Sequence, residues 1–361
     1  MGLMDSTYTY EKLQSKYKNF TIPAAKLLIG GTNILGIKEI TVQSIQIRLS
    51  LDSAGSATFS MNGNYDYKNG SFQSQLKSKA VLGKVVEVEL GYGSDTTKVF
   101  KGFLASLTMS FDVESGITYE ITALDARRLM MSDNKRETNH KIKNYSDAVN
   151  TVLKRYKKLC SLEVTATQDN LEDAVIVQKG SDYDFIVRKL IGEGMVDREF
   201  FIVADKAYFR KPKENSSPML TLEVGKGLKS FRRSSSYLNQ KILFLGQEEG
   251  TGNMLKGEAV AKNPDPQDSN LLDPGLVVEQ APDCHSESDL KKRAQSQADR
   301  LQDENNKATA SCVGLPEIVP GRYIKIDRVD SSVNKKYYVT GVTHSYSMGG
   351  FVTTMDMEGW K

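Results

Sequence analysis

Apolar residues alternate with polar ones through much of residues 23–125. The alternating positions are Ile45, Ile47, Leu49, Leu51, Ala57, Phe59 and Met61, followed by Val86, Val88, Leu90, Leu107, Met109, Phe111, Ile117, Tyr119 and Ile121. Because successive side chains of a strand point to opposite faces, this period of two predicts strands with one apolar and one polar face. Stretches rich in Gly, Asn, Asp and Ser separate the runs, so we expect residues 23–125 to form an antiparallel β-barrel.

The N-terminal residues show a helical period instead. Tyr10, Leu13 and Tyr17 fall on one face of a helix, and a proline follows the basic stretch. This spacing predicts a short amphipathic helix over residues 8–22. We expect residues 1–22 to form an arm that packs against the rest of the chain.

Helical periodicity replaces strand alternation in residues 126–217. The segment SDAVNTVLKRYKKLC places its apolar residues on one stripe behind Ser146, a possible N-cap. Ser181 and Asp184 have the spacing of a capping box at the start of a second helix, and FFIVADKAYFR has the pattern of a β-hairpin. We therefore expect residues 126–217 to form a small α/β insert domain that ends in the linker KPKENSSP.

Alternation returns in residues 218–361, beginning with the run from Leu220 to Val224 and continuing in KILFLG. We expect this region to be a second β-barrel. Four prolines in residues 261–283 predict a long surface loop there. Residues 286–305 carry a narrow apolar stripe, which predicts a helix whose apolar face lies against a barrel.

Two segments of the chain resemble each other in the order of their elements. VEVELGYGSDTTKVFKGFLASLTMSFDVESGITYEITALD and GRYIKIDRVDSSVNKKYYVTGVTHSYSMGGFVTTMDMEG both have the order strand, polar turn, strand, glycine, strand, hairpin, strand. In this alignment Gly102 matches Gly341. The alternating run that follows Gly102, with Leu107, Met109 and Phe111, corresponds as a whole to the alternating run that follows Gly341, with Val342, His344, Tyr346 and Met348. The alternative is that two unrelated β-meanders share this order. With a repeat, the fold is mainly β (α+β), with two related antiparallel β-barrel domains, a small α/β insert and a helix in the C-terminal region.

Charge and composition argue against several kinds of partner. Lys and Arg number 48 and Asp and Glu 45, and so balanced a charge does not indicate nucleic-acid recognition. No stretch approaches the roughly 18 apolar residues that span a bilayer, so membrane insertion is not expected. The N-terminus lacks the apolar run of a signal peptide, and we expect the chain to be made and folded in the cytoplasm.

Residues that could carry out chemistry are few and scattered. The cysteines are Cys160, Cys284 and Cys312, and the histidines are His140, His285 and His344. The cysteines form no C-x-x-C, the sequence has no G-x-S-x-G, H-E-x-x-H or Walker motif, and the glycines of GYGSDT and GKGLKS are expected to form turns. Cys284 precedes His285 at a helix entrance, where a packing or solvent-facing role is expected rather than that of a nucleophile. We therefore predict no catalytic, cofactor-binding or metal-binding residue and expect that the protein is not an enzyme.

Several segments also resemble a known family in their order and spacing. They are YEKLQSKYKNFTIP, VEVELGYG with VFKGFLASL, GSDYDFIVRKL, SYLNQKILFLGQ, ESDLKKRAQSQADRL, PGRYIKI and YYVTGVTHSYSMGGFVTTM. They resemble the phage late-control protein D family, whose fold is shared by the N-terminal half of the valine-glycine repeat (VgrG) spike proteins. The resemblance implies a structural baseplate hub of a phage-like contractile tail or injection system.

The same resemblance implies the partners of the chain. In such a hub, a homotrimer with two barrels per chain presents a six-fold ring to the tail tube, contacts other baseplate proteins and holds a three-fold spike. VgrG proteins continue into a further barrel and a spike, whereas this sequence stops at Lys361, so the spike is expected to be a separate protein. Two alternatives are a tail-associated cell-wall hydrolase and a receptor-binding or glycan-binding β-protein.

Overall fold

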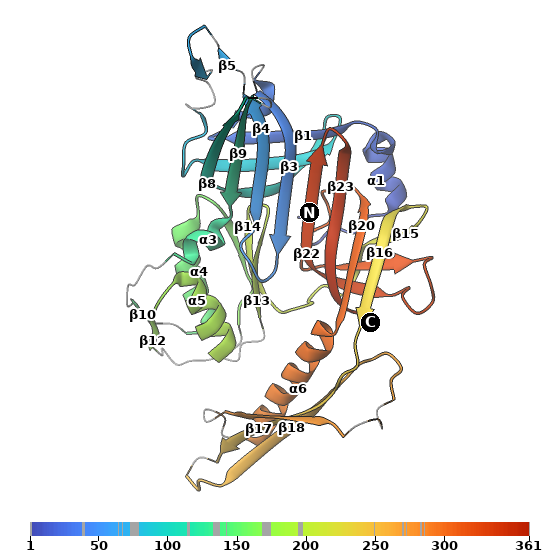
Figure 1. The fold of residues 1–361 in the computed structure, drawn as a ribbon. Helices are drawn as coiled ribbons and strands as arrows, with labels where there is room; N and C mark the ends of the chain where they lie inside the picture. The colour runs from blue at the N-terminus through green and yellow to red at the C-terminus, as the bar shows by residue number, and fades with distance from the viewer. Residues whose placement is uncertain are drawn as a thin grey trace.

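β-Strands dominate the structure, which confirms the mainly β fold class (Figure 1). The structure is a computed structural model. It describes residues 2–37, 40–63, 65–66, 68–72, 79–113, 116–132, 138–141, 143–167, 175–193, 198–248, 250–268, 271, 273–281, 284 and 286–360. Most of the strands join one large sheet, and three smaller elements pack around it: an N-terminal arm, an insert and a C-terminal lobe.

The N-terminal arm contains a shorter helix than the sequence predicts. Helix α1 (Tyr10–Lys16) is followed by one 3-10 turn, η1 (Lys18–Phe20). The Thr9 hydroxyl caps α1 by accepting a hydrogen bond from the backbone of Lys12. The helix ends early because the residues of η1 adopt positive φ angles, which are incompatible with a right-handed helix. Leu13 and Tyr17 are buried, so the predicted apolar face does pack against the body.

The first β-module lies within residues 23–124. Its strands are β1 (Pro23–Ile29), β3 (Ile40–Ser50), β4 (Ser56–Gly63), β7 (Val85–Tyr92), β8 (Asp95–Asp112) and β9 (Gly116–Leu124). Short elements accompany them: β2 (Thr32–Asn33), η2 (Ile34–Gly36), β5 (Tyr65–Asp66) and β6 (Ser71–Phe72). The six main strands lie in the order β1-β7-β8-β9-β4-β3. GYGSDT forms the tight turn between β7 and β8, as expected.

The second β-module lies within residues 218–360. Its strands are β15 (Pro218–Val224), β16 (Gly227–Ser235), β20 (Asn306–Val313), β21 (Tyr323–Asp327), β22 (Lys336–Ser347) and β23 (Gly350–Trp360). They lie in the order β15-β21-β22-β23-β20-β16, and pairing between β15 and β16 closes a six-stranded barrel. GKGLKS forms the turn into β16, with positive φ angles at Gly225 and Gly227.

The two modules have the same strand order. When the strands of each are numbered along the chain, both sheets run first, fourth, fifth, sixth, third, second. This agreement supports the repeat that the sequence predicts, with two differences. β1 is antiparallel to β7 whereas β15 is parallel to β21, and among the described residues no pairing joins β1 to β3.

The β-hairpin at the end of each module corrects one detail of the sequence alignment. Counted from the β8–β9 turn and the β22–β23 turn, Phe111 occupies the position of Tyr346 and Leu107 that of Val342. Gly102, however, lies further from its turn than Gly341 does. The two glycines are therefore not equivalent, because β8 is the longer strand.

The insert has a hydrophobic core of its own. Its elements are α3 (Ala126–Met130), β10 (Thr138–Lys141), α4 (Tyr145–Leu153), η3 (Lys154–Tyr156), β11 (Ser161–Val164), β12 (Val175–Gln178), α5 (Asp182–Asp184), η4 (Phe185–Glu193), β13 (Glu199–Val203) and β14 (Lys206–Arg210). Ser181 caps α5 as predicted, and β13 pairs with β14 as the expected hairpin. The N-cap of α4 is Asn144 rather than Ser146, whose side chain is buried.

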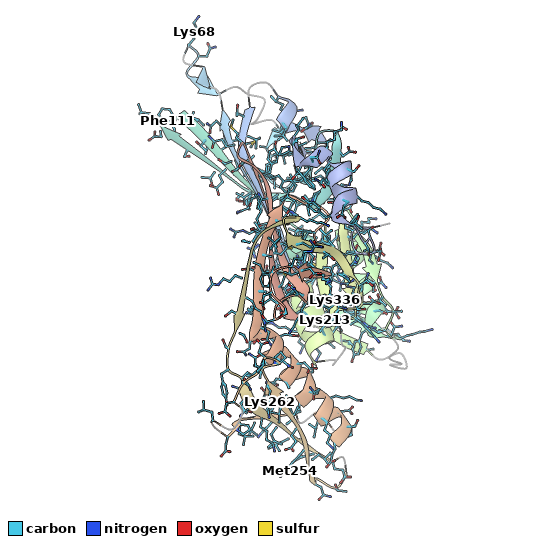
Figure 2. All side chains as sticks on the ribbon, turned by 90° about the vertical axis from the view of Figure 1, so that its right-hand side faces the viewer. Lys68, Phe111, Lys213, Met254, Lys262 and Lys336 are labelled. Atoms are coloured by element: carbon cyan, nitrogen blue, oxygen red, sulfur yellow. The ribbon has the colours of Figure 1, made fainter. Side chains whose placement is uncertain are left out.

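The lobe consists of the elements inserted between β16 and β20. They are β17 (Asn239–Gln247), β18 (Met254–Lys262), β19 (Gly275–Gln280) and α6 (Glu287–Glu304). β19 corrects the prediction of a loop over residues 261–283, because this strand pairs with β17 despite the nearby prolines. The helix is present as predicted, but its apolar stripe packs on β17 and β18 of a separate three-stranded sheet rather than on a barrel. The lobe projects from one end of the second module (Figures 1 and 2).

Candidate functional site

The histidines and cysteines are dispersed through different cores. His140 belongs to the insert and His344 to the second module, and both are buried. Cys160, Cys284 and Cys312 are also buried, and burial raises the pKa of the Cys160 thiol to about 12. His285, the sequence neighbour of Cys284, lies outside the described residues. Buried thiols with a raised pKa are poor nucleophiles, so the described cysteines suit packing.

A buried chain of hydrogen bonds in the insert was not foreseen from the sequence. His140 Nε2 lies 2.9 Å from Gln178 Oε1, and Gln178 Nε2 donates to Asp182 Oδ1 at 2.6 Å. The Tyr156 hydroxyl donates to the other oxygen of Asp182 at 2.6 Å, and Arg155 donates to Oδ1 at 2.7 Å. Each of the five side chains in this series of hydrogen bonds has a partner within the protein. The arrangement ties three segments of the insert together.

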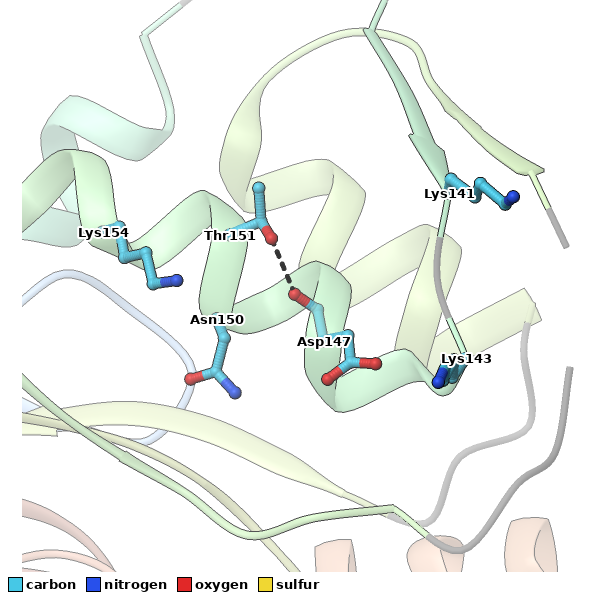
Figure 3. Close-up of a pocket in the computed structure, with 6 residues that line it drawn as sticks. All are labelled: Lys141, Lys143, Asp147, Asn150, Thr151 and Lys154. Atoms are coloured by element: carbon cyan, nitrogen blue, oxygen red, sulfur yellow. Dashed lines mark hydrogen bonds between the residues drawn. The ribbon is translucent and has the colours of Figure 1, made fainter. Parts of the chain in front are cut away.

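A cavity of about 640 Å³ lies beside α4 and is shown in Figure 3. Its lining residues are Lys141, Lys143, Asp147, Asn150, Thr151 and Lys154. Among these described lining residues Asp147 is the one carboxylate, and the Thr151 hydroxyl donates to its backbone carbonyl. A glycosidase requires two carboxyl groups flanking the bond that is cleaved. The described part of the lining therefore does not supply the two carboxyl groups that the hydrolase alternative needs.

Two further features are absent from the described part of the chain. There, no group of three or more His, Cys, Asp or Glu side chains is placed to hold a metal ion. No described helix combines the length and the apolar composition that a bilayer crossing requires.

The most extensive feature is a sheet that runs through both modules. Its strands lie in the order β8-β9-β4-β3-β22-β23-β20-β16, and every neighbouring pair is antiparallel. We call these eight strands the shared sheet. In Figure 1 it forms a wall with β8 at one side and β16 at the other. The sheet therefore consists of two equivalent four-stranded halves.

The halves of the shared sheet meet where β3 pairs with β22. The register runs from Gly341 opposite Ser50 to Ser347 opposite Ser44. On the buried face His344 lies opposite Ile47, and its Nδ1 is 3.0 Å from the hydroxyl of Thr353. Burial lowers the pKa of His344 to about 4, so the ring is neutral near pH 7. His344 is thus a residue of the junction between the modules, consistent with the strand position expected for it.

The N-terminal arm forms a second connection between the modules. The Tyr17 hydroxyl donates to Glu317 of the second module at 2.6 Å, and its ring contacts Tyr92 of the first module. The Tyr92 hydroxyl in turn donates to the carbonyl of Gly314 at 2.9 Å. Burial and the nearby Glu317 carboxylate raise the pKa of Tyr17, so its hydroxyl stays a donor. These contacts, together with one hydrophobic core that includes residues of both modules, connect the first module to the second.

The outer half of β8 is the exposed edge of the shared sheet. Sequence alternation placed Leu107, Met109 and Phe111 on the apolar face of a strand, and they are 37%, 53% and 61% exposed. Their partners on β9, by contrast, are buried; for example, Ile121 lies opposite Leu107 and is 0% exposed. Figure 2 shows Phe111 at the end of a hairpin that projects from the body. The apolar face of the sheet thus continues onto a strand that the described residues leave uncovered.

Three solved structures are similar to this chain. The 43 kDa tail protein of prophage MuSo2 from Shewanella oneidensis is 14% identical with a TM-score of 0.70, over 92% of this chain and 97% of that one. The tail protein from Neisseria meningitidis MC58 is also 14% identical with a TM-score of 0.70, over 94% and 97%. An Escherichia coli component of the type VI secretion system, described as similar to T4 tail proteins gp27 and gp5, is 12% identical with a TM-score of 0.56, over 93% and 77%. The chain therefore has the fold of phage tail proteins, as the resemblance implied.

Comparison with curated proteins gives no match. Comparison with family models gives a match over residues 19–241 to the Alg8 N-terminal domain. This span contains the first module, the insert and the first two strands of the second module, and it exceeds half of the 361 residues. The chain belongs to the Alg8 N-terminal domain family.

Proposed function

We propose that this chain is a structural baseplate hub of a phage-like contractile tail or injection system. In this role three copies form a ring that adapts a six-fold tail tube to a three-fold spike. The hub is not an enzyme, and it is assembled in the bacterial cytoplasm. Its partners are two further copies of itself, the tail tube ring, the spike and other baseplate proteins.

One observation carries this proposal: a single chain has two modules with the same strand order in one continuous sheet. Three such chains around an axis contain six similar modules, so a threefold ring can present a nearly sixfold surface. The fold likeness to phage tail proteins supports the same role. A ring of this kind needs stiff sheets and requires no reactive side chain.

Cryo-electron microscopy of assembled particles tests the proposal. We expect three copies of the chain between the tail tube and the spike, with the two modules alternating around the axis. A peripheral location, or a number of copies that is not a multiple of three, would reject the hub role. The hydrolase alternative would instead require that the purified chain degrade cell wall.

A further inference from the structure

We propose that the cavity beside α4 is a docking site for an acidic peptide segment of a protein partner. All of its described lining residues belong to the insert, so the inference goes beyond the hub role and does not rest on the ring of three. It is drawn from the shape of the cavity, the charge of its lining and the polar groups that lie between the charges.

The cavity follows one face of α4. Four lining residues are spaced three, four and seven positions apart, as neighbours on a helix surface are. They are Asp147, Asn150, Thr151 and Lys154. In Figure 3 Lys141 and Lys143 lie on one side of this stripe and Lys154 on the other, so the cations flank the neutral polar residues. The volume of about 640 Å³ falls within the roughly 300–1,000 Å³ of ligand pockets.

The three lysines of the lining are exposed and have no partner among the described residues. Neither an ion pair nor a hydrogen bond joins the ammonium group of Lys141, Lys143 or Lys154 to the described part of the chain. Arg155, by contrast, is bound to a carboxylate of the insert. Residues 138–160 contain six Lys or Arg and one acidic residue, whereas the whole chain has a charge of only +3. This local excess of positive charge attracts carboxylates.

The polar residues between the cations suit a peptide backbone. The Asn150 amide can donate and accept at the same time, as pairing with a peptide group requires. Thr151 donates its hydroxyl proton to the backbone carbonyl of Asp147 at 2.9 Å, which leaves the hydroxyl oxygen to accept an N–H. The Asp147 carboxylate is a further acceptor. A segment with carboxylates at both ends of the cavity and N–H groups between them would satisfy this lining.

Nucleic acid fits the same lining poorly. The described lining residues include no arginine and no aromatic ring, the groups that hold phosphates in a bidentate way and stack on bases. The backbone N–H groups of Ser146 and Asp147, at the start of α4, already donate to side chains of the insert. They are therefore not free to bind a phosphate as helix N-termini often do. The Asp147 carboxylate would also repel closely spaced phosphates.

Fluorescence anisotropy with the purified full chain tests this proposal. The probe is a short fluorescein-labelled peptide that alternates Glu and Gly, and the control peptide has Gln in place of each Glu. We expect the Glu peptide to bind and the Gln peptide not to bind. Binding should weaken as salt is added, because exposed ion pairs are screened.

Removing the three cations should weaken binding of the Glu peptide. Lys141→Gln, Lys143→Gln and Lys154→Gln are combined in one variant, and we expect about a tenfold loss of affinity from the loss of three exposed ion pairs. The side chains are exposed and lack partners among the described residues, so the circular dichroism spectrum and the melting temperature should not change.

A matched control removes the same charge elsewhere on the insert. It combines Lys158→Gln, Lys179→Gln and Lys211→Gln, three exposed positions outside the described lining. At physiological ionic strength this variant should change the affinity by less than about twofold, because charges further away than a Debye length are screened.

Asp147→Asn gives a test of opposite sign. It removes the one carboxylate of the described lining, so the Glu peptide should bind about twofold more tightly. A gain of affinity cannot come from unfolding, which keeps the test decisive should the triple-glutamine variant at Lys141, Lys143 and Lys154 fail to fold. No gain in Asp147→Asn would overturn the proposal.

Three other results would also overturn it. The first is equal binding of the Glu and Gln peptides, and the second is unchanged binding in the folded triple-glutamine variant. The third is a short labelled DNA duplex that binds more tightly than the Glu peptide and is released in that variant, since the occupant would then be nucleic acid. Threefold assembly in particles is measured separately, so failure of the hub role and failure of this docking site are distinguishable.

Discussion

The hydroxyl of Tyr338 lies 2.9 and 2.7 Å from the two carboxylate oxygens of Glu199. Tyr338 belongs to β22 of the second module and Glu199 to β13 of the insert, so this contact fixes the insert to the barrel. Arg210 donates to the same carboxylate at 2.9 Å. Burial raises the pKa of Glu199 even though Arg210 opposes the shift.

Tyr338→Phe should lower the free energy of unfolding by about 1–3 kcal/mol, because it removes one donor from a buried carboxylate. Urea unfolding measures the change. Tyr346→Phe is the matched control on the same strand and should change stability by less than about 0.5 kcal/mol. Equal losses of unfolding free energy in the two variants would show that the hydrogen bond from Tyr338 to Glu199 does not stabilise the chain more than the hydroxyl of Tyr346 does.

Arg127→Met should destabilise the chain by about 3–5 kcal/mol, because it leaves the buried Asp125 carboxylate without its charged partner. The Asp125 carboxylate accepts bonds from Arg127 Nη2 at 2.9 Å and from the backbone of Gly55 at 2.7 Å, and both charged side chains are buried. The neighbouring Arg128→Met changes an exposed side chain and serves as the control. Thermal and urea unfolding of both variants decide the matter, and similar midpoints would contradict this account.

Stability should depend on pH through His344. Its pKa is about 4 in the folded chain against 6.5 for an ordinary histidine, so the unfolded state binds more protons between these values. This contribution leaves stability unaffected above about pH 6.5 and lowers it as the pH falls toward 4, by about 3 kcal/mol in total.

His344→Gln removes this titration and should flatten the decline between pH 6.5 and 5. Urea unfolding at several pH values compares the variant with the unmodified chain. Carboxylates contribute below pH 5 in both proteins, so the comparison is made above that value. Parallel curves over this range would mean that the histidine does not titrate differently on unfolding.

Gly257→Ala should loosen the lobe. A Cβ at Gly257 would lie 2.2 Å from the carbonyl carbon of Leu290 in α6, so the helix must move away from β18. We expect a loss of about 1–3 kcal/mol and faster hydrogen exchange in β18 and α6. At Gly275, on β19, the nearest atoms are 3.9 Å away, so Gly275→Ala is the control. Unchanged exchange in the first variant would show that the helix adapts without cost.

Local patterns predicted many individual elements correctly. The cap at Ser181 and the hairpin from Glu199 to Arg210 depend on neighbours within a few residues, and both are present. Ser146 shows the limit of such patterns, because Asn144 is an equally suitable cap two residues earlier and takes the role. β19 was missed because its sheet partner β17 lies far away in sequence, so pairing outweighs the effect of the prolines.

The sequence by itself determined which residues alternate, where helices interrupt the strands, and that two β-modules of similar order are present. Tertiary structure alone decided which strand edges pair and which remain open. The reason is physical: alternation of side chains marks the faces of a strand, whereas its edges are backbone amides and carbonyls that almost every residue shares. Leu107 and Val342 therefore look alike in sequence, yet only Val342 is buried, because β3 pairs with its strand.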